Sequence, residues 1–271
     1  MKIKILIVSD VPWNDSNSFG SSFSNIFGGN DKYEIANIYL KEGVPNTSVC
    51  SRFFRITEKS IIGAMLGKRC PLGEEVYNCP GAVNQDEKMM KQAKILRWQV
   101  LFWLRDLVWA TKLWKSLELD KFITSFDPDI IFQPIFFEPY INIIGLYAKK
   151  LTNKPMIGYI SDDNYTIRYY RSFSPLKWIN RLIKRRYVKS TILQCELLYT
   201  ITAKQKDEYF EYFHVPTKVL YKGGNFSEET DYQSKSPSVK FVFTGNIYGG
   251  RWETLAMIAQ SLRKLRVEDL Y

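Results

Sequence analysis

The sequence predicts an α/β protein in which a parallel sheet is flanked by helices, and three observations predict this fold class. Apolar, β-branched runs alternate with helical patterns along most of the chain, as in sheets built from right-handed crossovers. The first run, KIKILIVS, contains a continuous apolar stretch, as expected of a strand buried on both faces. The length of 271 residues suits one or two domains with a packed core.

The first part of the chain predicts three strands, at residues 2–9, 33–40 and 52–56. Asp10 and Pro12 end the first strand, and a polar loop leads into a short helix that stops at the glycine pair 28–29. A second short helix is expected at residues 61–66. Residues 68–85 contain cysteine, proline and glycine, and they predict a loop.

Residues 87–119 predict a long helical region, either continuous or broken once. Its apolar residues form one stripe at helical spacing, and Trp98, Phe102 and Trp109 lie together on a second face. Either this helix is buried on both sides, or its outer face contacts lipid or a partner.

The second part of the chain continues the alternation of strands and helices. Further strands are expected at residues 129–132, 155–160, 196–202 and 219–221. Helices are expected at residues 140–151, 175–191 and 203–213.

A polar segment, GGNFSEETDYQSKSPS, follows at residues 223–238 and predicts a linker. Residues 239–271 then begin a new β-α unit, with a strand at 239–244, a glycine turn and a helix to about Leu265. One strand and one helix cannot bury a core of their own, so we expect an incomplete second domain.

Composition excludes several classes of protein. Apolar residues make up 45% of the chain and charged residues 24%, which is globular rather than disordered or collagen-like. No uncharged apolar run reaches the length of a membrane span, and the first run is too short for a signal peptide, so we expect a cytoplasmic protein. The four cysteines are irregularly spaced and the chain has one histidine, which argues for reduced thiols and against a zinc site.

Polar residues at the ends of predicted strands are the first candidates for a site, because ligands of open α/β sheets bind beyond the carboxyl ends of the strands. Gly20 and Ser21 open the first helix, where backbone N–H groups could approach a phosphate; an ordinary turn and N-cap is the alternative. Asp162 and Asp163 could act as a base or position hydroxyl groups, or they could cap a helix.

Two weaker constellations complete the candidate site. Gln133 and Glu138 flank Pro134 after a strand. They either line a cleft or are solvated loop residues. In the tail, a glycine turn followed by a cation suits a diphosphate, and it is formed by Gly245, Asn246 and Arg251.

The net charge of +10, from 38 Lys+Arg and 28 Asp+Glu, is concentrated in one basic stretch. Residues 164–195 carry eight Lys or Arg and no acid. One helical face, with apolar residues beside it, carries Lys177, Arg181, Lys184 and Arg185. Such a helix is typical of an anionic membrane surface; a solvated face and nucleic acid are the alternatives, and no nucleic-acid motif accompanies it.

Taken together, several segments resemble the GT-B glycosyltransferases of the glycosyltransferase-4-like group, which build bacterial capsular and exopolysaccharides. The resemblance covers most of the chain and lies in the order and spacing of six segments, which are KIKILIVSDVPW, SSFSNIFGG, FDPDIIFQP, NKPMIGYISDD, ELLYTITAKQKDEYF with VLYKGGNF, and VKFVFTGNIYGGRWETL.

The resemblance implies two Rossmann-like domains facing across a cleft, an acceptor-side domain and a domain that binds a nucleotide-sugar donor without a metal or other cofactor. It implies donor-phosphate roles for Gly20, Ser21, Gly245, Asn246 and Arg251. Asp162 stands near a position where many members carry a histidine. The donor-domain segment with two glutamates seven residues apart is absent from the sequence.

We therefore expect an acceptor-side domain at residues 1–222, a linker at 223–238 and the first β-α unit of a truncated donor domain at 239–271. The predicted function is sugar transfer to a lipid-linked or glycan acceptor in surface polysaccharide synthesis, at the inner membrane face. We expect this chain alone to be inactive. Alternatively, it is one subunit of a two-chain transferase whose partner chain supplies the donor half, or a non-catalytic binding or scaffolding module.

Overall fold

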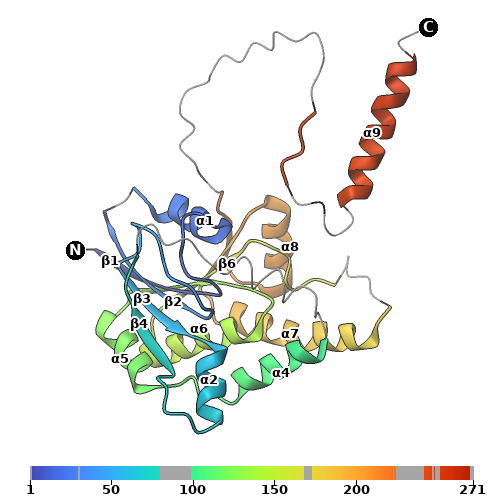
Figure 1. Ribbon diagram of the computed structural model, residues 1–271. Helices are drawn as coiled ribbons and strands as arrows, with labels where there is room; N and C mark the ends of the chain where they lie inside the picture. The colour runs from blue at the N-terminus through green and yellow to red at the C-terminus, as the bar shows by residue number, and fades with distance from the viewer. Residues whose placement is uncertain are drawn as a thin grey trace. The chain divides into compact units, whose positions relative to one another are not determined.

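The computed structural model describes residues 2–29, 31–79, 99–167, 173–221, 223, 241–245, 247 and 251–268. The chain divides into two units, Met1–Gly224 and Asn225–Tyr271, and each is considered by itself. The first unit contains the sheet and nearly all of the described helices (Figure 1).

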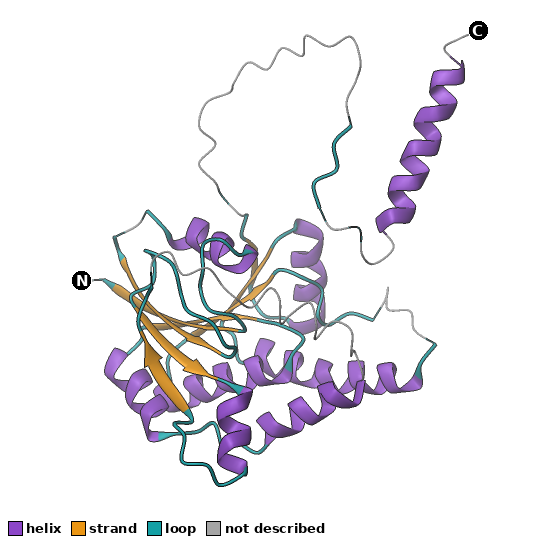
Figure 2. Cartoon of the chain, viewed as in Figure 1, coloured by secondary structure: helices purple, strands orange, loops and turns teal. Residues whose placement is uncertain are grey.

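The first unit is a Rossmann-like α/β fold, as predicted. Its described residues form one eight-stranded sheet in the order β4-β3-β2-β1-β5-β6-β7-β8 (Figure 2). All neighbouring strands run parallel except β3 and β4, which are antiparallel. The strands are β1 (Ile3–Ser9), β2 (Tyr33–Tyr39), β3 (Arg52–Ile56), β4 (Gly73–Val76), β5 (Ile130–Pro134), β6 (Met156–Ile160), β7 (Leu197–Thr200) and β8 (Thr217–Val219).

Two apolar clusters pack on opposite faces of the sheet, because successive strand residues point to alternate faces. One cluster joins the sheet to α1 (Ser18–Phe27) and is rich in aromatic rings, with Trp13 fully buried at its centre. The larger cluster lies under the remaining helices, which are α4 (Gln99–Ala110), α5 (Leu117–Phe126), α6 (Pro139–Thr152), α7 (Pro175–Ile192) and α8 (Ala203–Phe213). A further helix, α2 (Glu58–Met65), follows β3.

The long helix expected over residues 87–119 is interrupted in its described part. Lys112 adopts a left-handed backbone conformation (φ 61°) after α4, and the indole N–H of the buried Trp114 donates to the Trp109 carbonyl at 3.0 Å. The Ser116 side chain then accepts a hydrogen bond from Leu119 N and caps a separate helix, α5. The sequence predicted a continuous apolar stripe across this turn because a buried tryptophan lies on each side of it, Trp109 before it and Trp114 after it.

The outer surface of α4 is apolar, so the interpretation that this helix is buried on both sides is wrong for its described side chains. Trp109 is buried and stacks on Tyr140 with ring centroids 5.0 Å apart, whereas Leu107 is 63% exposed. Trp98 lies outside the described residues.

Two other predictions for the local structure are also corrected. Residues 73–76, expected to be loop, form β4, which pairs with β3 partly through charged side chains rather than an apolar pattern. Among the described residues of the tail, 241–244 form no strand; α9 (Arg251–Glu268) is helical as predicted.

Candidate active site

A cavity of about 280 Å³ lies at the carboxyl edge of the sheet, where α1 begins beside the ends of β5 and β6. This is the reversal point of the strand order, where β1 has β2 on one side and β5 on the other. Open α/β sheets bind ligands at such switch points. The cavity is lined by Ser18, Phe19, Ser22, Phe23, Pro134, Ile135, Phe136, Tyr159, Ser161 and Asp162.

The amino end of α1 forms one wall of the cavity. The Asn17 side chain caps the helix by accepting from Gly20 N at 2.7 Å, and Ser21 N donates to the Asn17 carbonyl at 2.9 Å. In the described ranges, no hydrogen bond engages the N–H groups of Ser18 and Phe19. The first turn also contains no acidic residue, so no side chain of the helix itself neutralises the partial positive charge of this end.

This arrangement corrects the prediction for Gly20 and Ser21, whose N–H groups are already used by the cap and the first turn. Gly20 has a packing role instead, since a Cβ atom there would lie 2.0 Å from the Asn14 carbonyl oxygen. The amides of Ser18 and Phe19 are the ones suited to an anion. Asn17 could have indicated this from sequence, because the side chain of an N-cap asparagine accepts from an amide two or three residues later and leaves the amides before that one unused.

The opposite wall is formed by the segment after β6. Ser161 and Asp162 line the cavity directly, together with Tyr159. Burial, and secondarily the charge of Asp162, raises the pKa of Tyr159, so this phenol stays protonated at neutral pH. Asp162 is solvent-exposed and is the carboxylate among the residues that line this cavity. Its predicted role as a base or a hydroxyl-positioning group stays a prediction.

Asp163 does not line the cavity and instead organises its own loop. Its carboxylate accepts hydrogen bonds from Tyr165 N at 3.2 Å, Thr166 N at 2.9 Å and the Tyr209 hydroxyl at 2.9 Å, and also from the Thr166 hydroxyl. Burial favours a higher pKa for Asp163, but these hydrogen bonds outweigh it and the pKa is lowered. The catalytic role predicted for Asp163 is therefore replaced by a structural one, and the turn it caps is not a helix.

Two of the four basic residues predicted to face a membrane instead support this loop from α7, and a third pairs with α4. Arg181 donates to the Thr166 carbonyl at 2.8 Å, and Arg185 donates to the Tyr165 carbonyl at 2.6 Å. Lys184 is 4% exposed and lies 3.7 Å from Asp106. The helical face that carries them is directed inward, so the prediction of a lipid-facing role is wrong for Lys184 and does not describe Arg181 and Arg185. Lys177 is exposed.

Gln133 and Glu138 are not among the residues that line the cavity. Gln133 is fully buried, and its Nε2 donates to the Pro134 carbonyl at 2.8 Å. Glu138 is the N-cap residue of α6. The prediction placed the wrong part of this segment at the site, because the strand continues through Gln133 and the chain reaches the cavity only at residues 134–136.

The tail residues belong to the second unit and are described separately. Gly245 is exposed, and Arg251 begins α9. Asn246 lies outside the described residues. The predicted phosphate-binding roles of these residues stay predictions.

A second polar cluster, which the sequence did not reveal, lies near the end of β1. Asp10 accepts a hydrogen bond from the Tyr140 hydroxyl at 2.8 Å and pairs with Lys41. The guanidinium carbon of Arg105 lies 4.9 Å from the centre of the Tyr140 ring. The cluster joins four elements distant in sequence, so no local spacing could have indicated it; it ties α4 and α6 to the edge that carries the cavity.

Within the described ranges, no group of three His, Cys, Asp or Glu side chains is placed to hold a metal ion, and no helix is both long and apolar enough to span a membrane. The predicted independence from metals and other cofactors stays a prediction.

No family model and no curated protein match the chain. Solved structures similar to it include UGT2 of Phytolacca americana complexed with UDP-2fluoro-glucose and pterostilbene, at 8% identity over 82% of this chain and 54% of that chain, with a TM-score of 0.44. Apo UGT2 matches at 10% identity, over 84% of this chain and 53% of that chain, with a TM-score of 0.40. A UDP-glucosyltransferase from Polygonum tinctorium matches at 8% identity, over 89% and 55%, with a TM-score of 0.40. The chain spans about half the length of these structures.

Proposed function

We propose that the protein is a glycosyltransferase that moves a sugar from a nucleotide-sugar donor to an acceptor hydroxyl group at the carboxyl edge of its sheet. One observation carries the proposal: the amino end of α1 and the carboxylate of Asp162 line the same cavity. A helix amino end stabilises the negative charge of a diphosphate, and a carboxylate accepts a proton from a hydroxyl group. The sequence resemblance to GT-B glycosyltransferases supports the same reaction.

In the proposed reaction, the acceptor hydroxyl oxygen forms a bond to the anomeric carbon of the donor, and the bond from that carbon to the diphosphate oxygen breaks. The hydroxyl proton passes to Asp162. The leaving diphosphate carries away the bonding electron pair, and the amides of Ser18 and Phe19 stabilise its negative charge. Such stabilisation is effective because these donors are fixed before the reaction begins.

The acceptor in this proposal is a lipid-linked or glycan acceptor of surface polysaccharide synthesis, bound by residues 1–222. Gly245, Asn246 and Arg251 would contribute to the donor side. The resemblance supports these finer assignments, together with a place at the inner face of the membrane.

Peripheral membrane association is supported by exposed apolar side chains rather than by the inward-facing basic residues. Trp103 of α4 donates to Asn180 of α7 at 3.1 Å, so the two helices lie side by side (Figure 1). On their solvent side, each exposes large apolar side chains, which are Leu104, Leu107, Leu176, Ile179, Leu182 and Ile183. Exposed Lys177 and Arg186 accompany them on α7, a combination that suits anionic lipid.

The decisive experiment is a titration of the ¹⁵N-labelled chain with UDP-glucose, GDP-mannose and dTDP-glucose, combined with a measurement of nucleoside diphosphate release. We expect at least one donor to shift the amide resonances of Ser18, Phe19 and Asp162. If the chain alone releases diphosphate, contrary to the expectation that it is inactive, Asp162→Asn should lower that release by about 100-fold or more, the scale of a lost general base.

Asp207→Asn is the matched control, because Asp207 is an exposed carboxylate on α8 whose side chain is 72% accessible. It should leave both measurements unchanged. If no donor shifts the cavity resonances, or if the chain releases diphosphate and Asp162→Asn leaves that rate unaltered, the proposal fails and a non-catalytic binding module becomes the better description.

A further inference from the structure

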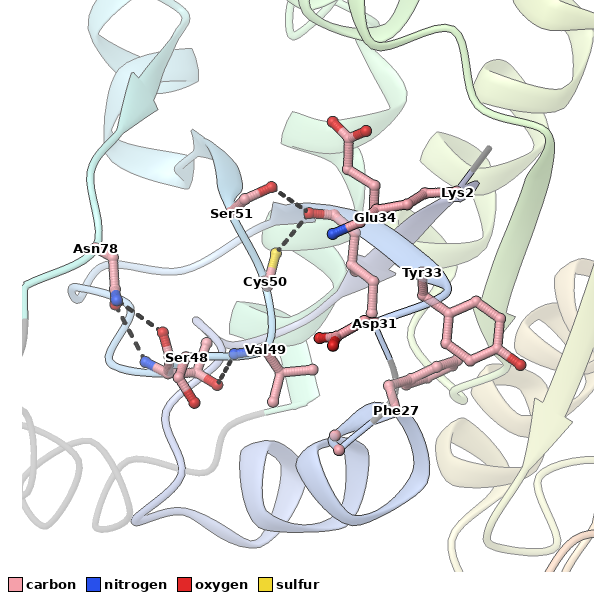
Figure 3. A pocket seen from close by; sticks show the side chains of 14 residues that line it. Lys2, Phe27, Asp31, Tyr33, Glu34, Ser48, Val49, Cys50, Ser51 and Asn78 are labelled. Atoms are coloured by element: carbon pink, nitrogen blue, oxygen red, sulfur yellow. Dashed lines mark hydrogen bonds between the residues drawn. The ribbon is translucent and has the colours of Figure 1, made fainter.

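A larger cavity, of about 530 Å³, lies at the other end of α1 (Figure 3). It is bounded by the carboxyl end of that helix, the start of β2 and the segment 47–51 that leads into β3. β2 spans seven residues, so at roughly 3.3 Å per residue the cavity is about 20 Å from the carboxyl edge of the sheet. It is therefore separate from the candidate active site.

The connection between β2 and β3 creates this hollow. Parallel strands are usually joined by a helix that covers the sheet, but residues 41–51 form none. Two hydrogen bonds hold the segment as a wall, since Asn78 Nδ2 donates to the Thr47 carbonyl at 2.7 Å and Thr47 N donates to Asn78 Oδ1 at 3.1 Å. The hollow is thus a built feature with a fixed boundary.

The cavity has an apolar floor and a polar rim. Phe27, Ile35 and Cys50 are buried at its floor, and burial raises the pKa of the Cys50 thiol so that it stays neutral. Asp31 and Ser48 are exposed at its rim. This combination suits a ligand with an apolar ring face and hydroxyl groups around its edge, which describes a sugar ring.

Several rim groups have unused hydrogen-bonding capacity. Within the described part of the chain, the side chains of Asp31, Glu34 and Ser48 make no hydrogen bond or ion pair. Figure 3 shows the Asp31 carboxylate directed across the hollow toward the segment that carries Val49 and Cys50. The Ser51 hydroxyl donates to the Ile35 carbonyl at 3.2 Å, which leaves its oxygen free to accept.

The electrostatics of the cavity disfavour an anionic ligand. Two carboxylates, Asp31 and Glu34, line it against one ammonium group, Lys2. The carboxyl end of α1 adds partial negative charge, because helix dipoles carry their negative pole at that end. The two ends of one helix therefore offer opposite environments, and only the amino end suits a diphosphate.

We propose that this cavity is a binding site for a neutral saccharide, at a distance from the reacting sugar. Carboxylate and hydroxyl oxygens on the rim accept hydrogen bonds from sugar hydroxyl groups, and the apolar floor receives the C–H face of the ring. Its assignment to an inner unit of the acceptor glycan rests on the proposed function. Saccharide binding itself does not.

The test is a titration of the ¹⁵N-labelled chain with maltohexaose, cellohexaose and chitohexaose, with UDP and inorganic phosphate as anionic probes. At least one oligosaccharide should shift the amides of residues 31–35 and 47–51. Asp31→Asn removes a charged acceptor with little change of shape, and Ser48→Trp fills the mouth of the cavity from an exposed position. Each should weaken oligosaccharide binding at least tenfold, whereas Asp207→Asn should not.

Circular dichroism establishes that each variant remains folded. The proposal is overturned if none of the three oligosaccharides shifts these amides, if shifts occur only around Ser18 and Asp162, or if phosphate binds here as tightly as the sugars. The two proposals fail separately, because the donor titration reports on residues 18–22 and 161–162 and the oligosaccharide titration on residues 31–51.

Discussion

The Tyr209 hydroxyl donates a hydrogen bond to Asp163 Oδ1 at 2.9 Å and so joins α8 to the loop that carries the candidate base, Asp162. Tyr209 is fully buried, and burial together with the charge of Asp163 raises the pKa of its phenol, which therefore remains a donor at any physiological pH. The hydrogen bond between Tyr209 and Asp163 therefore holds the loop that places Asp162 in the cavity, although Asp162 takes no part in that bond.

Tyr209→Phe should lower the free energy of unfolding by about 0.5–1.5 kcal/mol, with more if the freed carboxylate is poorly solvated. Chemical denaturation measures the loss. Tyr212→Phe, on the half-exposed neighbour of the same helix, is the matched control and should have little effect. Equal stability of the two variants would mean that the Tyr209 hydrogen bond contributes nothing.

The lowered pKa of Asp163 predicts a specific acid sensitivity. A carboxyl group whose pKa is lower in the folded than in the unfolded state stabilises the fold above its unfolded pKa of about 3.9. That stabilisation is lost as the pH falls through the folded value. The stability difference between the wild type and Asp163→Asn should therefore be constant near neutrality and shrink below about pH 4. Denaturation curves between pH 7 and pH 2.5 provide the measurement, and a difference independent of pH would contradict the assignment.

Gly145→Ala should destabilise the protein because the added methyl group would clash with the Gln133 side chain. A Cβ atom at position 145 would lie 1.8 Å from Gln133 Oε1, in a buried region beneath α6. Overpacking of this kind costs about 1–3 kcal/mol. Because the obstacle is a side chain, the double variant Gln133→Ala/Gly145→Ala should be more stable than the sum of the two single effects. Simple additivity in thermal melts would show that the two positions do not interact.

Gly20→Ala should be at least as damaging, and it should resist rescue. Its Cβ atom would meet the backbone of Asn14, with the carbonyl oxygen 2.0 Å away, so no side-chain truncation removes the clash. We expect a clear fall in melting temperature and a loss of the donor-induced shifts at Ser18 and Phe19. Ser21→Ala, at the next residue, should leave both nearly unchanged. A Gly20→Ala protein with unaltered stability would contradict the close packing of the first turn.

Binding to vesicles that contain anionic phospholipid should depend on apolar rather than inward-facing basic residues of α7. Ile179→Ser/Leu182→Ser removes two exposed side chains, each of which would contribute up to about 1.5–3 kcal/mol if fully buried in lipid. Cosedimentation should show the loss of binding. Lys184→Met should instead lower stability, because it removes one of the two cations that pair with the partly buried Asp106 carboxylate and leaves only Arg105. A folded Lys184→Met protein should bind vesicles normally. Weaker binding by Lys184→Met alone would favour the basic face.

The strand positions followed from sequence more reliably than the functional contacts did. Apolar runs such as KIKILIVS mark strands because burial on both faces leaves little choice of residue. By contrast, β4 pairs with β3 partly through arginine–glutamate pairs, and the turn between α4 and α5 contains a buried indole hydrogen bond, so neither has an apolar period that a sequence scan could detect.

A cavity lies at the edge of the sheet where the sequence predicted the site, but several of the predicted residues do not line it. Asp162 was identified because its position after a strand determines its location. In the sequence, Asp163 cannot be told from a catalytic carboxylate, and Arg181 cannot be told from a surface cation. Only their long-range hydrogen bonds show that both support the loop. The direction of a helical face depends on what packs against it, and residue spacing does not carry that information.

The ion pairs between β3 and β4 have a consequence for the behaviour of the protein at high concentration. β4 ends the described sheet with only four residues, and its Glu74 and Glu75 pair with Arg55 and Arg52 of β3. At the opposite edge, the three-residue β8 carries an exposed lysine, Lys218. Short, charged margins oppose intermolecular strand addition. Concentrated samples should therefore resist β-mediated aggregation, and replacing the two glutamates by uncharged residues should weaken that resistance.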